Sequence, residues 1–302
     1  MSALARPLEI YLRSVANHVL DLARRGRGMD ILGAVPGRPP AEDVEIEVDR
    51  VCQGLLEQWC QETGIEMEIY SEHGTIRSTG NTVSKASFHG RAPLRYLVAA
   101  DPFDGSGLFQ RGLAAEWWSV LSIYDIDTLA PVCGGAVDIL RREIYLAEGD
   151  MVTLVSLETG GRVPLRVPNK PGLDGQTVIA AYMMDPSYLS DWIRNAGALL
   201  AALVDRFPSV RLWPNGGSCI YPWLARGLVH AYVMFNEPRS EIDPGVAFAR
   251  AAGFPLFSVQ QDGVLKPYEF IPGLQSERVP FFIAACTRGL SEEIVKEILH
   301  SG

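Results

Sequence analysis

The sequence predicts an α/β fold, and three observations support this prediction. Apolar residues recur every three or four positions from Leu8 to Leu22 and again from Val44 to Trp59, which is typical of helices with one buried face. In the second half of the chain, short apolar runs alternate with helical patterns. The composition, with 47% hydrophobic and 21% charged residues among 302, is that of a globular chain with a substantial core.

The first half of the chain is expected to place a series of strands after its two helices. The second helix should span about residues 43–62, and an alternating pattern at 65–70 predicts a half-exposed strand. A polar stretch rich in Gly and Ser follows to about residue 90, which predicts a long loop. Further strands are expected at 95–100 and 117–127, with a pair of strands within 133–150.

The second half is expected to alternate strands with helices. The strands are predicted at 177–184, 229–235, 254–260 and 280–286, and the helices at 190–207, 218–226, 244–253 and 291–300. The change of pattern near residues 150–170 divides the chain into two expected domains, an α+β half over 1–155 and an α/β half over 156–302.

Charge and cysteine content exclude several classes of protein. Acidic residues outnumber basic ones by 36 to 27, and no basic block stands out, so nucleic acid is not an expected partner. No apolar stretch is long enough to span a bilayer, and the first residues indicate a helix rather than a signal peptide. The five cysteines are scattered without metal-ligand spacing, which is typical of reduced thiols and predicts a cytoplasmic location.

One short motif, Asp101-Pro102-Phe103-Asp104-Gly105-Ser106, directly follows the strand expected at 95–100. The end of a strand in an α/β sheet is a common place for ligand binding. Two carboxylates held close together repel each other unless a cation or a proton neutralises them, and a hard cation such as Mg²⁺ suits oxygen ligands. The small residues that follow offer backbone N–H groups to an anion, which together with a metal indicates phosphate chemistry. A simple turn is the alternative, because Asp, Pro and Gly all favour turns.

The motif resembles the D-P-[LI]-D-G-[ST] element of the magnesium-dependent, lithium-sensitive phosphatases, the superfamily of inositol monophosphatases and fructose-1,6-bisphosphatases. Four further elements follow the family's order, namely Asp49 on the second helix, Ser71-Glu72-His73, Gly217-Ser218-Cys219, and Asp243 ahead of Ala251-Ala252-Gly253. The resemblance covers residues 8–300 and implies a layered sandwich of helices and two sheets.

The resemblance also implies a role for each matching residue. Metal-ligand oxygens would come from the Glu72, Asp101, Asp104 and Asp243 carboxylates and the Phe103 carbonyl, and they would hold two or three Mg²⁺ ions, which Mn²⁺ can replace. The catalytic set would be Asp49, Ser106 and Glu72, with Asp49 and Ser106 orienting the attacking water. The backbone of Gly105 and Ser106 would hold phosphate oxygens, and Gly217 and Ser218 would line the alcohol side.

The implied function is the hydrolysis of a small phosphate ester, either an inositol phosphate or a sugar phosphate, by metal-activated water in a homodimer or tetramer. A fructose-1,6-bisphosphatase and a nucleotide 3′-phosphatase of the same superfamily remain open. His73 stands where the family has a second Glu, so a non-catalytic binding or regulatory member is a further alternative. The adjacent Trp117 and Trp118 are expected to provide surplus apolar area for the homodimer.

Overall fold

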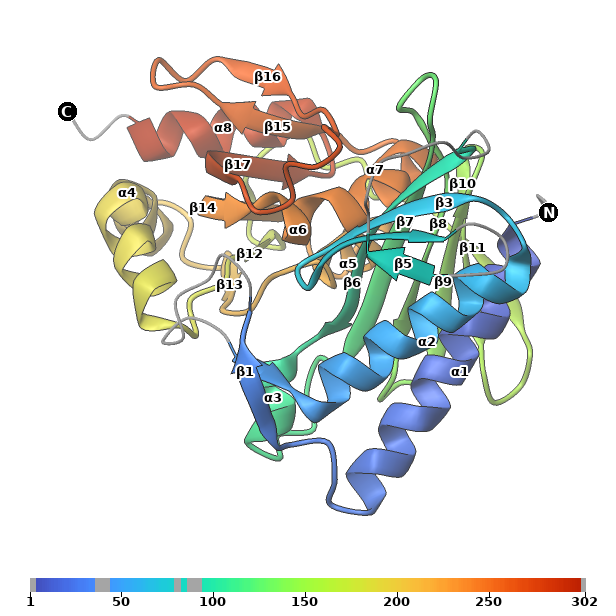
Figure 1. Cartoon of the computed structure of the whole chain (residues 1–302). Helices are drawn as coiled ribbons and strands as arrows, with labels where there is room; N and C mark the ends of the chain where they lie inside the picture. Colours follow the sequence, from blue (N-terminus) through green and yellow to red (C-terminus); the bar gives the residue numbers. More distant parts are fainter. Residues whose placement is uncertain (1–3, 36–43, 79–82, 86–93, 300–302) are drawn as a thin grey trace.

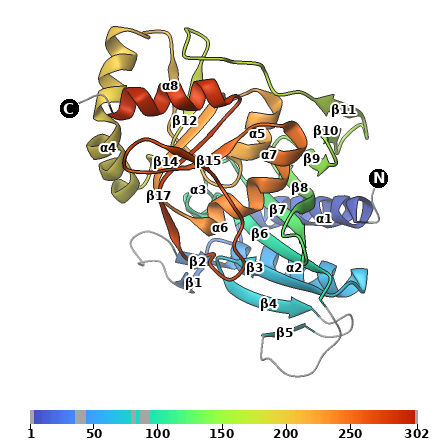
Figure 2. The same ribbon diagram turned by 90° about the horizontal axis from the view of Figure 1, so that it is seen from above.

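The computed structural model describes residues 4–35, 44–78, 83–85 and 94–299 of the chain. Helices and two large β-sheets are stacked in layers, as Figures 1 and 2 show from two directions. The helices α1 (Ala5–Arg24) and α2 (Glu47–Thr63) cover the first sheet, α5 (Ile220–Arg226) and α7 (Val246–Ala252) lie between the sheets, and α4 (Pro186–Asp205) and α8 (Arg288–Leu299) cover the second. The expected α/β class and the layered sandwich with two sheets are therefore confirmed.

Within the described residues, the first sheet has nine strands and is antiparallel except where β3 runs parallel to β6. Its strands, in spatial order, are β11 (Arg162–Leu165), β10 (Met151–Ser156), β9 (Glu143–Glu148), β8 (Pro131–Asp138), β7 (Trp118–Asp125), β6 (Tyr96–Asp104), β3 (Met67–Ser71), β4 (Gly74–Ser78) and β5 (Val83–Lys85). The loop expected after residue 71 instead begins with the short strands β4 and β5, while residues 79–82 and 86–90 of it lie outside the described residues.

In the part of the chain that the structure describes, the second sheet has six strands and mixes parallel with antiparallel pairs. Its strands, in spatial order, are β13 (Arg211–Trp213), β12 (Val178–Ala180), β14 (Ala231–Pro238), β17 (Arg278–Ala285), β15 (Leu256–Val259) and β16 (Leu265–Pro267). Because β11 still belongs to the first sheet, the change from one sheet to the other falls between residues 165 and 178, beyond the boundary expected at 155.

Five short elements complete the described chain. They are β1 (Ile31–Ala34) and β2 (Val44–Ile46), which pair with each other, the helices α3 (Ser106–Gln110) and α6 (Arg239–Ile242), and the 3-10 turn η1 (Asp243–Gly245). Both α3 and α6 begin directly after a long strand, so each carries its side chains to the end of a sheet.

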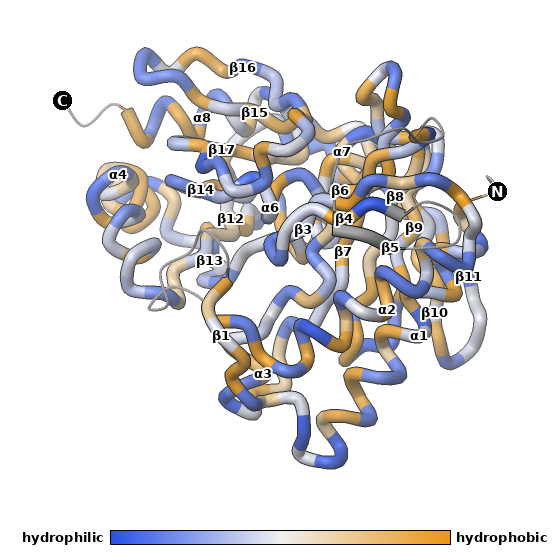
Figure 3. The backbone as a smooth tube through the Cα atoms, viewed as in Figure 1, coloured by the Kyte–Doolittle hydropathy of each residue, from blue (hydrophilic) through white to orange (hydrophobic). Residues whose placement is uncertain are grey.

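Hydrophobic patterning follows the layers. Along α1 and α2, hydrophobic residues alternate with hydrophilic ones in Figure 3, because each helix packs one face on the first sheet and turns the other to solvent. Among the described residues, no helix is both long enough and apolar enough to cross a bilayer.

A bulge in β6 explains how the two aspartates of the motif come to share one site. Asp101 pairs with Val120 of β7 and Asp104 pairs with Trp118, so three steps along β6 match two steps along β7. On a regular strand, side chains three residues apart point to opposite faces. The extra residue cancels this alternation, and it also accommodates Pro102, whose missing N–H cannot join the ladder.

The two adjacent tryptophans are both buried within the chain. Trp117 is 6% exposed and packs on Phe109, whereas Trp118 is fully buried against Tyr145 and Trp223. The expectation that this pair leaves apolar area for a dimer is therefore wrong, because aromatic side chains from α3, β9 and α5 already cover the two rings.

Candidate functional site

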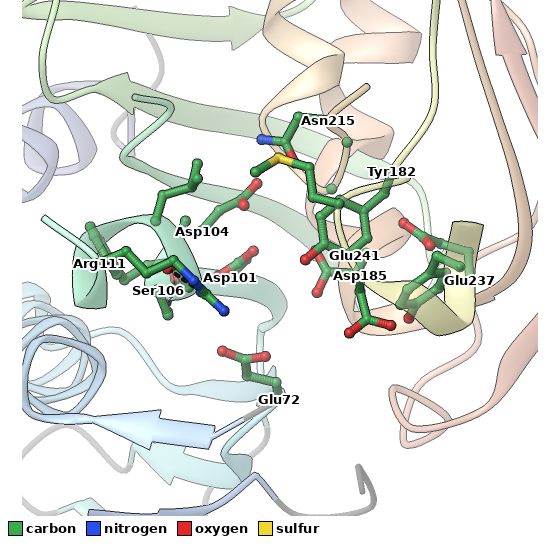
Figure 4. Close-up of a pocket in the computed structure, with 18 of the residues that line it drawn as sticks. Glu72, Asp101, Asp104, Ser106, Arg111, Tyr182, Asp185, Asn215, Glu237 and Glu241 are labelled. Carbon is green, nitrogen blue, oxygen red and sulfur yellow. Dashed lines mark hydrogen bonds between the residues drawn. The ribbon is translucent and has the colours of Figure 1, made fainter. Parts of the chain in front are cut away.

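A cavity of about 380 Å³ opens where the ends of the two sheets meet, and Figure 4 shows its labelled side chains pointing toward a common space. The first half of the chain contributes Glu72, the end of β6, α3 and Arg111, and the second half contributes Tyr182, Met184–Pro186, Tyr188, Asn215–Gly217, Glu237 and Glu241. The cavity thus combines side chains that are far apart in the sequence.

Three carboxylates converge at the base of this cavity. Oxygen atoms of Asp101, Asp104 and Glu241 all lie within 4.8 Å of one another. Asp101 and Asp104 end β6, and Glu241 belongs to α6, which begins where β14 ends. Glu72, at the end of β3, also lines the cavity, with its carboxylate 3.4 Å from His73 Nε2.

Neighbouring groups hold the two aspartates in place. The hydroxyl of Ser218 lies 2.9 Å from Asp101 Oδ2 and 3.1 Å from Asp104 Oδ2, and the backbone N–H of Cys219 donates to Asp104 Oδ2 at 2.8 Å. Gly217 has a φ of +104°, and a Cβ there would lie 3.0 Å from Asp104 Oδ2 and 3.2 Å from Glu241 Oε2. A side chain at position 217 would therefore fill the space between the carboxylates.

Burial and mutual repulsion disfavour the charged forms of these carboxylates. Burial, with the neighbouring Glu241, raises the pKa of Asp104 to about 8, even though hydrogen bonds from Cys219 and Ser218 act in the opposite direction. Burial, followed by Glu241 and Asp104, raises the pKa of Asp101 well above its usual range. Ionising these buried, neighbouring carboxylates therefore costs free energy, and a bound cation would offset that cost.

A second pair of residues lies beside the carboxylates. The hydroxyl of Ser106 donates to Asp49 Oδ1 at 2.5 Å, and Asp49 Oδ2 accepts the backbone N–H of Ile46 at 2.7 Å. Ser106 Oγ is also 3.2 Å from the carbonyl oxygen of Phe103. The structure thus brings together Asp49 and Ser106 as expected, and it places the Phe103 carbonyl next to them.

Asp243 lies elsewhere. It does not line the cavity; its Oδ1 accepts a hydrogen bond from Tyr268 at 2.6 Å and lies 3.6 Å from Arg239 Nη2. Residues two positions apart near the start of a helix point in different directions, so Glu241 faces the other carboxylates while Asp243 faces the buried Arg239. The position expected for Asp243 in the cluster is therefore held by Glu241.

Most of the other expected residues line the cavity, whereas Asp49 and Ser218 do not line it but form hydrogen bonds to residues that do, and several unexpected residues join the lining. Gly105, Ser106 and Gly217 line the cavity, and Ser218 bonds its aspartates. Sequence reasoning missed Glu241 and the wall formed by Arg111, Tyr182, Asp185 and Tyr188. The only sequence signal for Glu241 was a second acid two positions before Asp243, at the junction of a strand and a helix.

The donor set fits a hard divalent cation. All candidate ligands are carboxylate or carbonyl oxygens, which Mg²⁺, Mn²⁺ and Ca²⁺ prefer. Within the described part of the chain, Asp101 Oδ1 is fully buried and has no hydrogen-bond partner, although a buried oxygen normally has one. Asp101 as a whole is only 5% exposed, and its carboxylate lies beside those of Asp104 and Glu241. Its unpartnered oxygen is therefore suited to bind a metal ion.

Neither a protein-family model nor a curated protein matches the sequence, whereas solved structures do. The fold is shared with solved structures of inositol monophosphatase family proteins, and several of these matches cover 97% or more of the chain.

Three of the matching structures illustrate the likeness. The extragenic suppressor protein SuhB from Bartonella henselae is 13% identical with a TM-score of 0.66 and covers 100% of both chains. An inositol monophosphatase family protein from Staphylococcus aureus is 16% identical with a TM-score of 0.69 over 99% of this chain and 96% of that one. An inositol monophosphatase/NADP phosphatase complexed with NADP and Ca²⁺ is 15% identical with a TM-score of 0.64 over 99% and 95%.

Proposed function

We propose that the protein is a Mg²⁺-dependent phosphomonoesterase that hydrolyses an inositol phosphate or a sugar phosphate. The observation that carries this proposal is the convergence of Asp101, Asp104 and Glu241 beside the hydrogen-bonded pair of Ser106 and Asp49. The fold agrees with the proposal, since the solved structures that share it include phosphatases.

The candidate ligands for the metal ions are the cavity carboxylates and one carbonyl. Asp101, Asp104, Glu241 and Glu72 would supply carboxylate oxygens, and Phe103 would supply its carbonyl oxygen. Bound Mg²⁺, two or three ions with Mn²⁺ as a substitute, would lower the pKa of water and stabilise the leaving oxygen. We assign Asp243 to the support of α6 rather than to the metal.

Ser106 and Asp49 would handle the proton of the attacking water. The water oxygen forms a bond to phosphorus while the bond from phosphorus to the alcohol oxygen breaks, and the leaving alkoxide takes up a proton from solvent. Ser106 Oγ can accept a hydrogen bond from the water and pass its own proton toward Asp49 Oδ1, with which it already forms a hydrogen bond. Gly105 and Ser106 would offer backbone N–H groups to the phosphate, and Gly217 would face the alcohol side. Ser218, which the sequence assigned to the same side, is fully buried and would act through its hydrogen bonds to Asp101 and Asp104.

The substrate is tested by phosphate release across a panel. Purified protein is assayed with inositol monophosphates, sugar monophosphates, fructose 1,6-bisphosphate and nucleotide 3′-phosphates, with Mg²⁺ and with excess chelator. We expect release from an inositol or sugar monophosphate that stops with chelator. If a protein that binds Mg²⁺ releases no phosphate from any ester, the enzymatic proposal is contradicted and a binding or regulatory role is favoured instead.

A cytoplasmic location stays a prediction from the cysteines, and a homo-oligomer of two or four chains stays a prediction from the resemblance. The tryptophan pair gives the homo-oligomer no support, since both rings are buried.

A further inference from the structure

The cavity contains a cation as well as its carboxylates. Arg111 follows directly after α3, and its guanidinium points into the cavity in the direction of Asp101 and Glu72 (Figure 4). It is the only Lys, Arg or His among the described residues that line the cavity, whereas six of the lining residues are Asp or Glu.

The side chain of Arg111 is held back against its own helix. Its Nη1 donates to the carbonyl oxygen of Gly107 at 2.6 Å. A Cβ at Gly107 would lie 3.2 Å from the same Nη1, which is closer than ordinary van der Waals contact. Gly107 has no positive φ, so its backbone conformation does not require glycine. The absence of a side chain at position 107 instead gives the guanidinium room to lie over the first turn of α3.

This arrangement leaves most of the guanidinium unused. Of its five N–H donors, the bond to Gly107 uses one. Among the described residues, no carboxylate lies within the 4.0 Å of an ion pair with Arg111, despite the acidic lining of the cavity. A planar fork with free donors matches the oxygens of a phosphoryl group and can bind two of them at once.

We propose that Arg111 binds the phosphoryl group of the substrate, and likewise the inorganic phosphate product, on the side of the cavity formed by α3. The inference rests on the proposed function for the identity of the ligand. Arg111 would be a substrate-binding residue. Its side chain would supply positive charge to the phosphate dianion in addition to that of the metal ions. Gly107 would act as its positioning residue by leaving space for the guanidinium.

The test measures binding of inorganic phosphate to the full-length, Mg²⁺-loaded protein by titration calorimetry, separately from turnover. In Arg111→Gln we expect the Kd for phosphate to rise by about tenfold, the size of one charge-assisted contact at an open site, and Arg111→Lys should recover part of the loss. The affinity for Mg²⁺ alone should stay equal or become tighter, because a positive charge has been removed near the metal ligands. A purely structural role for Arg111 would weaken the binding of both phosphate and Mg²⁺, rather than that of phosphate alone.

Two variants serve as controls. Gly107→Ala keeps the charge but crowds the guanidinium, so it should weaken phosphate binding in the wild-type background and have no effect in the Arg111→Gln background. Lys266→Gln, which removes an exposed positive charge on β16 outside the cavity, should leave phosphate binding unchanged.

The two proposals fail in different ways. Wild-type phosphate affinity in Arg111→Gln would overturn the inference about Arg111, even if the protein hydrolyses phosphate esters. A wild-type protein that binds phosphate through Arg111 but releases none from any ester would overturn the proposed function and leave the inference standing.

Discussion

The hydroxyl of Ser106 donates a hydrogen bond to Asp49 Oδ1 at 2.5 Å, although the two residues are 57 positions apart in the sequence. Asp49 cannot turn away freely, because its other oxygen accepts the backbone N–H of Ile46 at the start of α2. The serine therefore meets an oriented acceptor, which is the geometry that general-base chemistry requires.

Removal of this hydroxyl should affect turnover more than metal binding. Ser106→Ala is expected to lower kcat by about a hundredfold, the low end for one lost acid–base contact, with little change in the affinity for Mg²⁺. Steady-state kinetics and calorimetric Mg²⁺ titration measure the two quantities. Unchanged kcat in a folded Ser106→Ala protein would contradict the role given to this pair.

Asp104→Asn should separate metal chemistry from folding. The amide can keep the hydrogen bonds from Ser218 and Cys219 but loses a charge that the metal needs. We expect a folded protein with kcat reduced by about a hundredfold or more, the scale for losing a preorganised electrostatic group. If the motif were only a turn, the melting temperature would fall and the folded fraction would keep its activity.

Glu241 and Asp243 offer a matched pair of charge-neutralising changes two positions apart. Glu241→Gln should weaken Mg²⁺ binding and abolish turnover while preserving the fold, because its carboxylate lies with those of Asp101 and Asp104.

Asp243→Asn should instead destabilise the protein. It leaves the buried guanidinium of Arg239 without its carboxylate partner, and breaking a buried pair of this kind costs about 3 kcal/mol. Urea unfolding of the two variants, alongside Mg²⁺ titration, distinguishes them. Loss of metal affinity in Asp243→Asn with unchanged stability would restore Asp243 as a ligand.

The cavity carboxylates should make stability depend on pH in a direction that metal reverses. The folded-state pKa of Asp104, about 8, lies above its usual value of 3.8, so the folded protein holds a proton that the unfolded chain has lost. The contribution of Asp104 to the stability of the metal-free protein is therefore most favourable at low pH, and it decreases as the pH rises toward 8.

Thermal unfolding in chelator at pH 5 to 8, repeated with Mg²⁺, measures this effect. We expect the stabilisation by Mg²⁺ to increase with pH, with proton release on binding, because the metal competes with the proton for the same oxygens. The Asp104→Asn variant is the control and should show a smaller pH dependence. If the wild type in chelator became more stable as the pH rises, and the Asp104→Asn variant did not, the assignment would be contradicted.

Local sequence patterns predicted individual helices and strands, because an apolar period depends only on residues that are close together in the chain. The strand that ends in the Asp101–Ser106 motif and the helix that carries Asp49 were both predicted, since each has a clear apolar period. The choice between Glu241 and Asp243 was not predictable in this way. Both acids stand at one junction, and only the buried Arg239 and Tyr268, brought in by packing, draw Asp243 away from the cavity.

The cavity wall opposite the motif escaped prediction for a related reason. Tyr182, Asp185 and Tyr188 have no spacing that is typical of a site, and Asp185 could be read only as the cap of α4. They become part of the cavity because the packing of the two sheets brings the start of α4 to the same cavity as the end of β6. Likewise, no sequence pattern marked Arg111 as a site residue, because the direction of its side chain depends on the short helix α3.

The three converging carboxylates also set the order in which the protein can acquire its chemistry during synthesis. Asp101 and Asp104 leave the ribosome long before Glu241, which comes from the second sheet's side of the cavity. A nascent chain that has folded only its first sheet would present two aspartates without the third carboxylate and without Ser218 and Cys219 to hold them. The complete cluster of three carboxylates should therefore form only once the second sheet has folded against the first, and a product truncated before residue 241 should bind Mg²⁺ more weakly than the full chain.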